Sequence, residues 1–97
     1  MAPGAHVPAS VRPLIARLAA APGVRHVVLF GSRARGDHRE RSDVDLAVDA
    51  PGLSKADWAR LWLDADDART LYRVDLVRLD EAPDGLCQRI EAEGVDV

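Results

Sequence analysis

Three aspartates and their spacing suggest the most specific chemistry in this sequence. Asp43 and Asp45 stand one residue apart in Ser-Asp-Val-Asp-Leu, at the edge of an apolar run. In an extended segment, residues i and i+2 point to the same face and lie roughly 7 Å apart. Asp75 lies in Val-Asp-Leu-Val, which repeats the pattern around Asp45, and a neighbouring strand in register would lie only about 4.8 Å away. We therefore expect three carboxylates on one side of a sheet.

Carboxylates gathered in this way favour a bound metal ion. Without a positive partner they would repel one another and raise their own pKa values. Magnesium prefers oxygen ligands, keeps some waters and is usually held by one or two carboxylates together with substrate phosphates. Two such ions about 3.5 to 4 Å apart can activate an attacking oxygen and stabilise a leaving one. The pattern predicts that Asp43, Asp45 and Asp75 hold magnesium and act on phosphate.

A Gly-Ser pair before the aspartates is suited to binding phosphate. Gly31 and Ser32 follow an apolar run, and a strand that ends there and turns into a short helix would point free backbone N–H groups outward. Gly31 has no side chain to keep a phosphate away from the backbone, and Ser32 adds a hydroxyl donor. Arg33 and Arg35 could supply the positive charge that a triphosphate needs.

Each of these patterns also has a simpler interpretation. The Gly-Ser pair could be an ordinary turn, and Ser-Asp-x-Asp could be a turn with side-chain-to-backbone hydrogen bonds. Arg33 and Arg35 could be solvated or could pair with acidic neighbours, which are Asp37 and Glu40. Asp75 could be a solvated residue on an edge strand. These alternatives stay open at the level of single motifs.

The periodicity of the chain predicts the elements that must position these residues. We expect a first helix capped by Ser10, followed by a strand, a short helical turn and a second strand. A helix capped by Ser54, a third strand and a final helix complete the order. The expected ranges are 10–21, 24–30, 32–35, 44–48, 54–65, 71–79 and 86–93. This order predicts an α/β (α+β) fold, a three-stranded mixed sheet flanked by helices, in one domain over residues 10–97 after a tail over 1–9.

Two tryptophans stand on one face of the helix expected over 54–65. Trp58 and Trp62 are four residues apart, so we expect them in the core rather than on a partner surface. If one of them is exposed, it becomes a candidate interface anchor.

Composition restricts the classes of function. The chain has 97 residues, a formal charge of -3 and a pI near 5.5, whereas nucleic-acid-binding domains usually have a pI above about 9. Twelve of its thirteen cationic residues are arginines, so a local anion site is still available. The single Cys87 cannot form an internal disulfide, which suits a reducing compartment. We find no export signal and no membrane span, and expect a cytoplasmic protein.

The motifs together resemble minimal nucleotidyltransferases of the DNA polymerase beta-like superfamily. Gly31-Ser32-x-Ala34-Arg35-Gly36, a charged spacer, Ser42-Asp43-x-Asp45-Leu46 and a later strand with Asp75 carry the resemblance. It covers most of residues 10–95, including Ile90-x-x-Glu93-Gly94 near the end. The resemblance implies that Asp43 and Asp45 bind both catalytic magnesium ions and that Asp75 activates the acceptor hydroxyl or completes one metal site. It also implies a nucleotide-binding set of Gly31, Ser32, Arg33, Arg35 and Ser42, with the Gly-Ser pair on the β/γ-phosphates.

The same resemblance implies a reaction and a partner. The reaction would move AMP from ATP to a hydroxyl and release pyrophosphate. Minimal nucleotidyltransferases of this size are often encoded beside HEPN-domain ribonuclease toxins, which implies an antitoxin that adenylylates a tyrosine of its partner and forms a hetero-oligomer with it. The main alternative is an inactive antitoxin or adaptor that neutralises its partner by binding alone. Transfer to RNA or to an antibiotic is disfavoured by the acidic pI and by the absence of a substrate domain.

Overall fold

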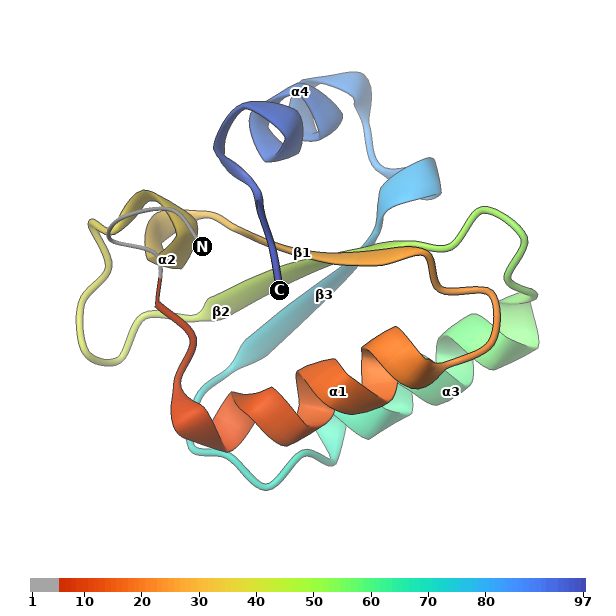
Figure 1. The fold of residues 1–97 in the computed structure, drawn as a ribbon, viewed down its shortest axis with the longest axis horizontal. Coiled ribbons are helices and arrows are strands. Elements are labelled where there is room, and N and C mark those ends of the chain that lie inside the picture. The colour runs from red at the N-terminus through yellow and green to blue at the C-terminus, as the bar shows by residue number, and fades with distance from the viewer. Residues whose placement is uncertain (1–5) are drawn as a thin grey trace.

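The computed structural model describes residues 6–97, which form one sheet with helices on both faces (Figure 1). Its strand order is β3-β2-β1-β4, and β2 runs antiparallel to β1 and parallel to β3. The strands are β1 His26–Phe30, β2 Val44–Asp49, β3 Val74–Arg78 and β4 Val95–Asp96. The helices are α1 Arg12–Ala20, α2 Ser32–Arg35, α3 Lys55–Asp66 and α4 Asp84–Glu93, with 3-10 turns at Ala9–Val11 and Leu79–Glu81.

The sheet has one strand more than the sequence predicted. β4 pairs antiparallel with β1, so that Val28 lies opposite Asp96 and Leu29 opposite Val95. A two-residue strand is too short to produce the alternation of apolar and polar residues by which strands are recognised. The expected three-stranded sheet was therefore wrong, whereas the mixed sheet flanked by helices is confirmed.

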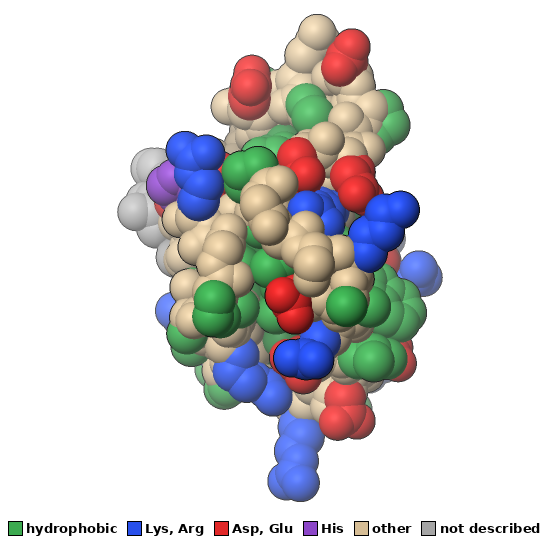
Figure 2. Space-filling model, turned by 90° about the vertical axis from the view of Figure 1, so that its right-hand side faces the viewer, with side chains coloured by type: hydrophobic (Ala, Val, Ile, Leu, Met, Phe, Trp, Pro, Cys, Tyr) green, Lys and Arg blue, Asp and Glu red, His purple; other side chains and the backbone are tan. Residues whose placement is uncertain are grey.

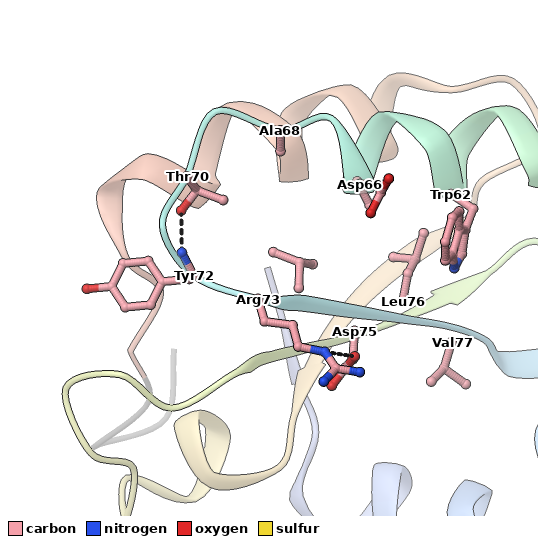
Figure 3. A pocket seen from close by; sticks show the side chains of 11 residues that line it. Trp62, Asp66, Ala68, Thr70, Tyr72, Arg73, Asp75, Leu76 and Val77 are labelled. Carbon is pink, nitrogen blue, oxygen red and sulfur yellow. Dashed lines mark hydrogen bonds and ion pairs between the residues drawn. The ribbon is translucent and has the colours of Figure 1, made fainter.

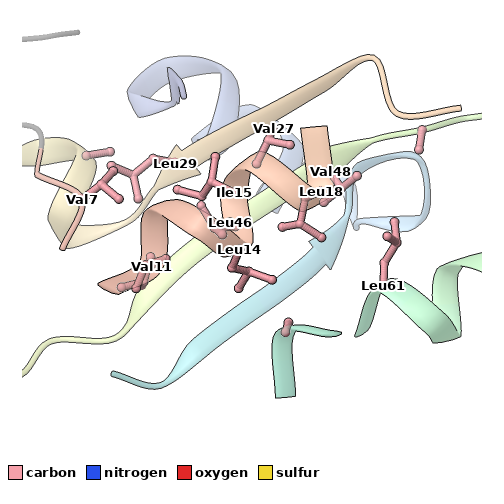
Figure 4. Close-up of a cluster of buried hydrophobic side chains, with 14 of the residues drawn as sticks. Val7, Val11, Leu14, Ile15, Leu18, Val27, Leu29, Leu46, Val48 and Leu61 are labelled. Atoms are coloured by element: carbon pink, nitrogen blue, oxygen red, sulfur yellow. The ribbon is translucent and has the colours of Figure 1, made fainter. Parts of the chain in front are cut away.

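The main core lies between the sheet and the helices α1 and α3 (Figure 4). Leu14, Ile15 and Leu18 of α1 follow helical spacing and are buried. Val7 is 3% exposed and belongs to the same core. Of the tail expected over residues 1–9, residues 1–5 lie outside the described residues.

A smaller core on the opposite face of the sheet determines where the aspartates point. Ile90 of α4 packs there on Phe30 and Ala47. Leu46 belongs to the main core instead, because successive side chains of a strand point to opposite faces. Asp45 therefore lies on the α4 face of β2, together with Ala47.

The helix starts differ in one respect from the expectation. Ser54 caps α3, since its Oγ accepts a hydrogen bond of 3.1 Å from the Asp57 backbone N–H. Ser10 does not cap α1, because it lies in a 3-10 turn and its Oγ bonds Thr70 Oγ1 at 2.8 Å. Among residues 6–97, no helix has the length and apolar character that crossing a bilayer requires.

Candidate active site

Two of the three predicted aspartates occupy matching positions on adjacent strands. In the parallel ladder between β2 and β3, Asp45 lies opposite Asp75. Parallel pairing in this register turns both side chains to the α4 face of the sheet. Asp43 comes two residues before Asp45 and is exposed just ahead of β2. The sequence left the register of this strand open, and the structure places the two Val-Asp-Leu segments directly opposite each other.

The turn after β1 brings Gly31 directly against Asp45. Phe30, the last residue of β1, pairs with Asp45 across the antiparallel ladder. Gly31 has a φ of +74°, which residues with a side chain rarely adopt. A Cβ at this position would collide with Asp45 Oδ2. Glycine is therefore required here both by the backbone and by the carboxylate that lies against it.

The environment of Asp45 makes it the most perturbed carboxylate of the cluster. Burial raises the pKa of Asp45 to about 6, and the negative charges of Asp75 and Asp43 add to the rise. A hydrogen bond with the Asp75 carboxyl also raises this pKa, whereas the positive charge of Arg35 lowers it. A carboxylate that gains a proton for these reasons is equally suited to gain a cation.

The donor set fits magnesium better than a metal held by protein alone. Among the described residues, no three His, Cys, Asp or Glu side chains form a closed metal-binding group. Magnesium does not need one, because it commonly uses one or two carboxylates, waters and substrate phosphates. Asp45 and its two acidic neighbours offer only hard oxygen donors, and the Gly31 turn lies directly against them. The residues present therefore fit a magnesium–nucleotide complex.

Arg33 does not point toward this cluster, in contrast to the prediction. Its side chain is 1% exposed. Its Nε donates to the Ser42 carbonyl and its Nη2 to the Glu40 carbonyl, both at 3.1 Å. The guanidinium also lies 4.9 Å from the centre of the Tyr72 ring. A buried cation needs such partners, and here they fasten the loop before β2. Pairing with the Glu40 carboxylate, the simpler alternative, is not what the structure contains.

Arg35 remains at the surface beside the site. It donates to Asp37 Oδ2 at 3.1 Å and to both carboxylate oxygens of Glu93 at 3.0 and 3.1 Å. These hydrogen bonds raise the pKa of Arg35 further above its ordinary value. Glu93 thereby ties the end of α4 to α2. The predicted pairing of Arg35 with Asp37 is present, and a phosphate contact by Arg35 remains a prediction.

Serine and arginine contacts complete the surroundings of the aspartates. Ser42 Oγ accepts a hydrogen bond of 2.8 Å from the Arg39 backbone N–H and closes the turn ahead of Asp43. Arg73 Nε pairs with Asp75 Oδ1 at 3.2 Å. Sequence reasoning missed Arg73, although its position two residues before Asp75 on the same strand face was a usable signal.

A family model described as "Polymerase beta, Nucleotidyltransferase" matches residues 13–97. The chain belongs to this nucleotidyltransferase family. The family and the enzyme class expected from the motifs are thereby confirmed.

Relatives of this nucleotidyltransferase include a protein adenylyltransferase and chains of toxin–antitoxin structures. Protein adenylyltransferase MntA of Thermococcus cleftensis is 37% identical over 78 residues, which make up 77% of this chain and 76% of that protein. A chain in the crystal structure of a toxin–antitoxin complex with AMP-PNP is similar with a TM-score of 0.69 and 31% identity, over 90% of this chain and 68% of that one. A chain in the structure of tri-AMPylated Shewanella oneidensis HEPN toxin with MNT antitoxin has a TM-score of 0.61 and 29% identity, over 89% and 64%.

Proposed function

We propose that this chain is a magnesium-dependent protein adenylyltransferase that moves AMP from ATP to a tyrosine hydroxyl of a HEPN-domain toxin and so acts as an antitoxin. The relatives support the class of reaction and of partner, since one is a protein adenylyltransferase and another is bound to an AMPylated HEPN toxin. A tyrosine is the acceptor implied by the resemblance of the motifs.

One observation carries the proposal. Gly31 lies so close to the Asp45 carboxylate that even a methyl group would not fit between them. The same carboxylate lies in register with Asp75 on the neighbouring strand. The turn proposed to bind phosphate thus lies directly beside the acidic cluster proposed to bind metal. A nucleotide with bound magnesium needs both in one place.

The residues have distinct roles in this proposal. Magnesium, when bound, would neutralise phosphate charge and polarise the reacting phosphoryl group. Asp43 and Asp45 would hold it. Gly31 and Ser32 would donate hydrogen bonds to the β- and γ-phosphates, from the backbone and the hydroxyl. Ser42 would keep the loop closed ahead of Asp43.

Asp75 would accept the proton of the acceptor hydroxyl. The acceptor oxygen then forms a bond to the α-phosphorus of ATP, and the bond from that phosphorus to the bridging oxygen of the β-phosphate breaks. Pyrophosphate leaves with the electron pair of the broken bond. Arg73, which pairs with Asp75, would orient its carboxylate toward the incoming hydroxyl.

A protein acceptor fits the surface charge better than a nucleic acid does. Acidic and basic side chains are interspersed on the face that Figure 2 shows, which offers no broad positive area for a phosphate backbone. The formal charge of -3 agrees with this preference.

The proposal can be tested by intact mass spectrometry of a HEPN-domain toxin after incubation with this chain, magnesium and ATP. The wild type is expected to add the mass of AMP, and Asp45→Asn is expected to add none. Asp49→Asn is the matched control, because Asp49 lies on the same face of β2, at its other end, and this variant should transfer AMP like the wild type.

Two results would contradict the proposal. Transfer by Asp45→Asn at the wild-type rate would exclude the metal role of Asp45. A stable complex whose partner never gains mass with any variant would favour an antitoxin that acts by binding alone.

A further inference from the structure

The two edge strands of the sheet, β3 and β4, differ in length. β4 has only two residues, whereas β3 has five, and no strand within residues 6–97 pairs with the outer edge of β3. In the β2–β3 ladder the Arg73 carbonyl accepts from the Val44 N–H at 2.9 Å. Because backbone groups alternate in direction along a strand, those of Val74 and Leu76 face outward. They are free to pair with another chain.

A groove of about 630 Å³ runs along this edge between β3 and α3 (Figure 3). Trp62 of α3 stands over it and is 49% exposed, whereas Trp58 packs against the main core. The expectation that both tryptophans are internal was wrong for Trp62. An exposed tryptophan beside open strand edge is the kind of anchor that dominates binding energy at protein interfaces.

The groove is continuous with the candidate active site. Asp75 lines the groove and also faces Asp45. A strand added along β3 would place the side chain opposite Asp75 on the same face of the sheet as Asp75 itself, with Cβ atoms about 4.5 to 5.5 Å apart. A hydroxyl on that side chain would lie beside the carboxylate that we assign to take its proton.

We propose that an extended segment of the acceptor protein binds as an additional strand along the outer edge of β3, with its reactive residue opposite Asp75 and an apolar side chain against Trp62. This inference rests on the proposed function and adds how the acceptor docks. Charge favours a segment with basic residues, because Asp66 and Asp75 outnumber Arg73 in the groove. Main-chain hydrogen bonds would supply affinity, and alternate side chains would supply specificity.

Residue-resolved amide exchange tests the strand pairing directly. The chain is measured alone and then with the HEPN-domain toxin used in the transfer assay, using Asp45→Asn so that no transfer occurs. The amides of Val74 and Leu76 should exchange fast in the free chain and slow at least about tenfold in the complex. The amides of Asp75 and Val77 should be slow in both, since they face β2. Unchanged exchange at Val74 and Leu76 in a formed complex would overturn the proposal.

Kinetics with Trp62→Ala provides a second test. Its KM for the HEPN protein should rise about tenfold with kcat unchanged, as expected for loss of an interface anchor. Leu63→Ala is the matched control, because Leu63 is exposed on the same helix and does not line the groove. Wild-type KM for Trp62→Ala would count against the docking site.

The outcomes separate this inference from the proposed function. Transfer by the wild type without slowed exchange at β3 would overturn the docking proposal alone. Absence of both transfer and complex would overturn the proposed function and the docking with it. Slow exchange of Val74 and Leu76 in the free chain would mean that a second copy covers the edge, which also contradicts the proposal.

Discussion

Two buried arginines hold the loops at opposite ends of β2, and their partners differ. Arg33 binds the carbonyls of Glu40 and Ser42 ahead of β2 and lies over the Tyr72 ring. Arg78 binds the carbonyls of Ala50 and Leu53 after β2, at 3.2 and 2.6 Å. It also pairs with Asp80 Oδ1 at 2.9 Å.

The difference lies in how each positive charge is compensated. Arg78 uses a carboxylate, whereas Arg33 uses only neutral groups and an aromatic face. Arg33 therefore takes up neither Asp43 nor Asp45. Similar anchoring thus holds a plain connection at one end of the strand and the candidate active site at the other.

The largest expected effect comes from the turn at the reactive end. Gly31→Ala should lower the rate of AMP transfer at least about a hundredfold, because its Cβ would displace the Asp45 carboxylate. Gly52→Ala is the control, since nothing lies within 4 Å of the Cβ it would add. Initial rates and melting temperatures of both variants give the answer. If Gly31→Ala transferred AMP at the wild-type rate, close packing of the turn on the Asp45 carboxylate would not be required for activity.

Substitution of the two arginines tests the comparison itself. Arg33→Met should lower the transfer rate about tenfold and raise the magnesium concentration needed for half-maximal rate, because the loop that carries Asp43 loses its anchor. Arg78→Met should cost on the order of 1–3 kcal/mol of unfolding free energy, because the Ala50 and Leu53 carbonyls lose their buried donor, while the magnesium requirement of the folded enzyme stays unchanged. Magnesium titrations and urea unfolding distinguish the two. Equal magnesium dependence would mean that both arginines act on stability alone.

The pKa of Asp45 predicts a pH dependence of stability in metal-free protein. Its pKa rises from 3.8 to about 6 on folding, so its favourable contribution is present below about pH 4 and is lost as pH rises through about 6. Asp45→Asn should therefore be more stable than the wild type at pH 7, by on the order of 1–2 kcal/mol after allowance for solvent screening, and nearly equal at pH 4. Urea unfolding with a chelator at the two pH values measures this. If the difference in unfolding free energy between the two proteins were the same at pH 4 and pH 7, the raised pKa of Asp45 would be contradicted.

The smallest effect concerns the ring beneath Arg33. Tyr72→Leu should lower unfolding free energy by about 1 kcal/mol through loss of the cation–π contact, and Tyr72→Phe should lose little of it. Chemical unfolding of the two variants separates the contribution of the aromatic ring to stability from that of the hydroxyl group. Equal loss in both would assign the effect to the hydroxyl instead.

Sequence patterns predicted the parts of this molecule that repeat or alternate. The repeated Val-Asp-Leu segments indicated that Asp45 and Asp75 share a face of the sheet, because a slip of one residue would turn the apolar residues away from the main core. They left the register itself open, since a slip of two residues keeps the same faces. Capping by Ser54 was predictable because its hydrogen bond is local. β4 was not, since a strand of two residues is too short to show the alternation by which strands are recognised.

The arginines show more clearly what sequence patterns could not predict. Four arginines lie within residues 33–41, and nothing in their types distinguishes the buried Arg33 from the exposed Arg35. The difference arises from tertiary structure, since Tyr72, some forty positions later in the chain, provides the surface on which Arg33 lies. Exposure of Trp62 also depends on tertiary structure, since no strand within residues 6–97 lies beside the outer edge of β3. The helical periodicity of α3 carries no information about this.

Thermal melting with magnesium and AMP-PNP tests most directly the claim that only one end of β2 is a nucleotide site. The wild type and Asp49→Asn should melt at higher temperature only when both ligands are present, since a ligand bound by the folded state alone stabilises it by mass action. Asp45→Asn should show no such rise. An equal rise in Asp45→Asn, or none in the wild type, would contradict the account.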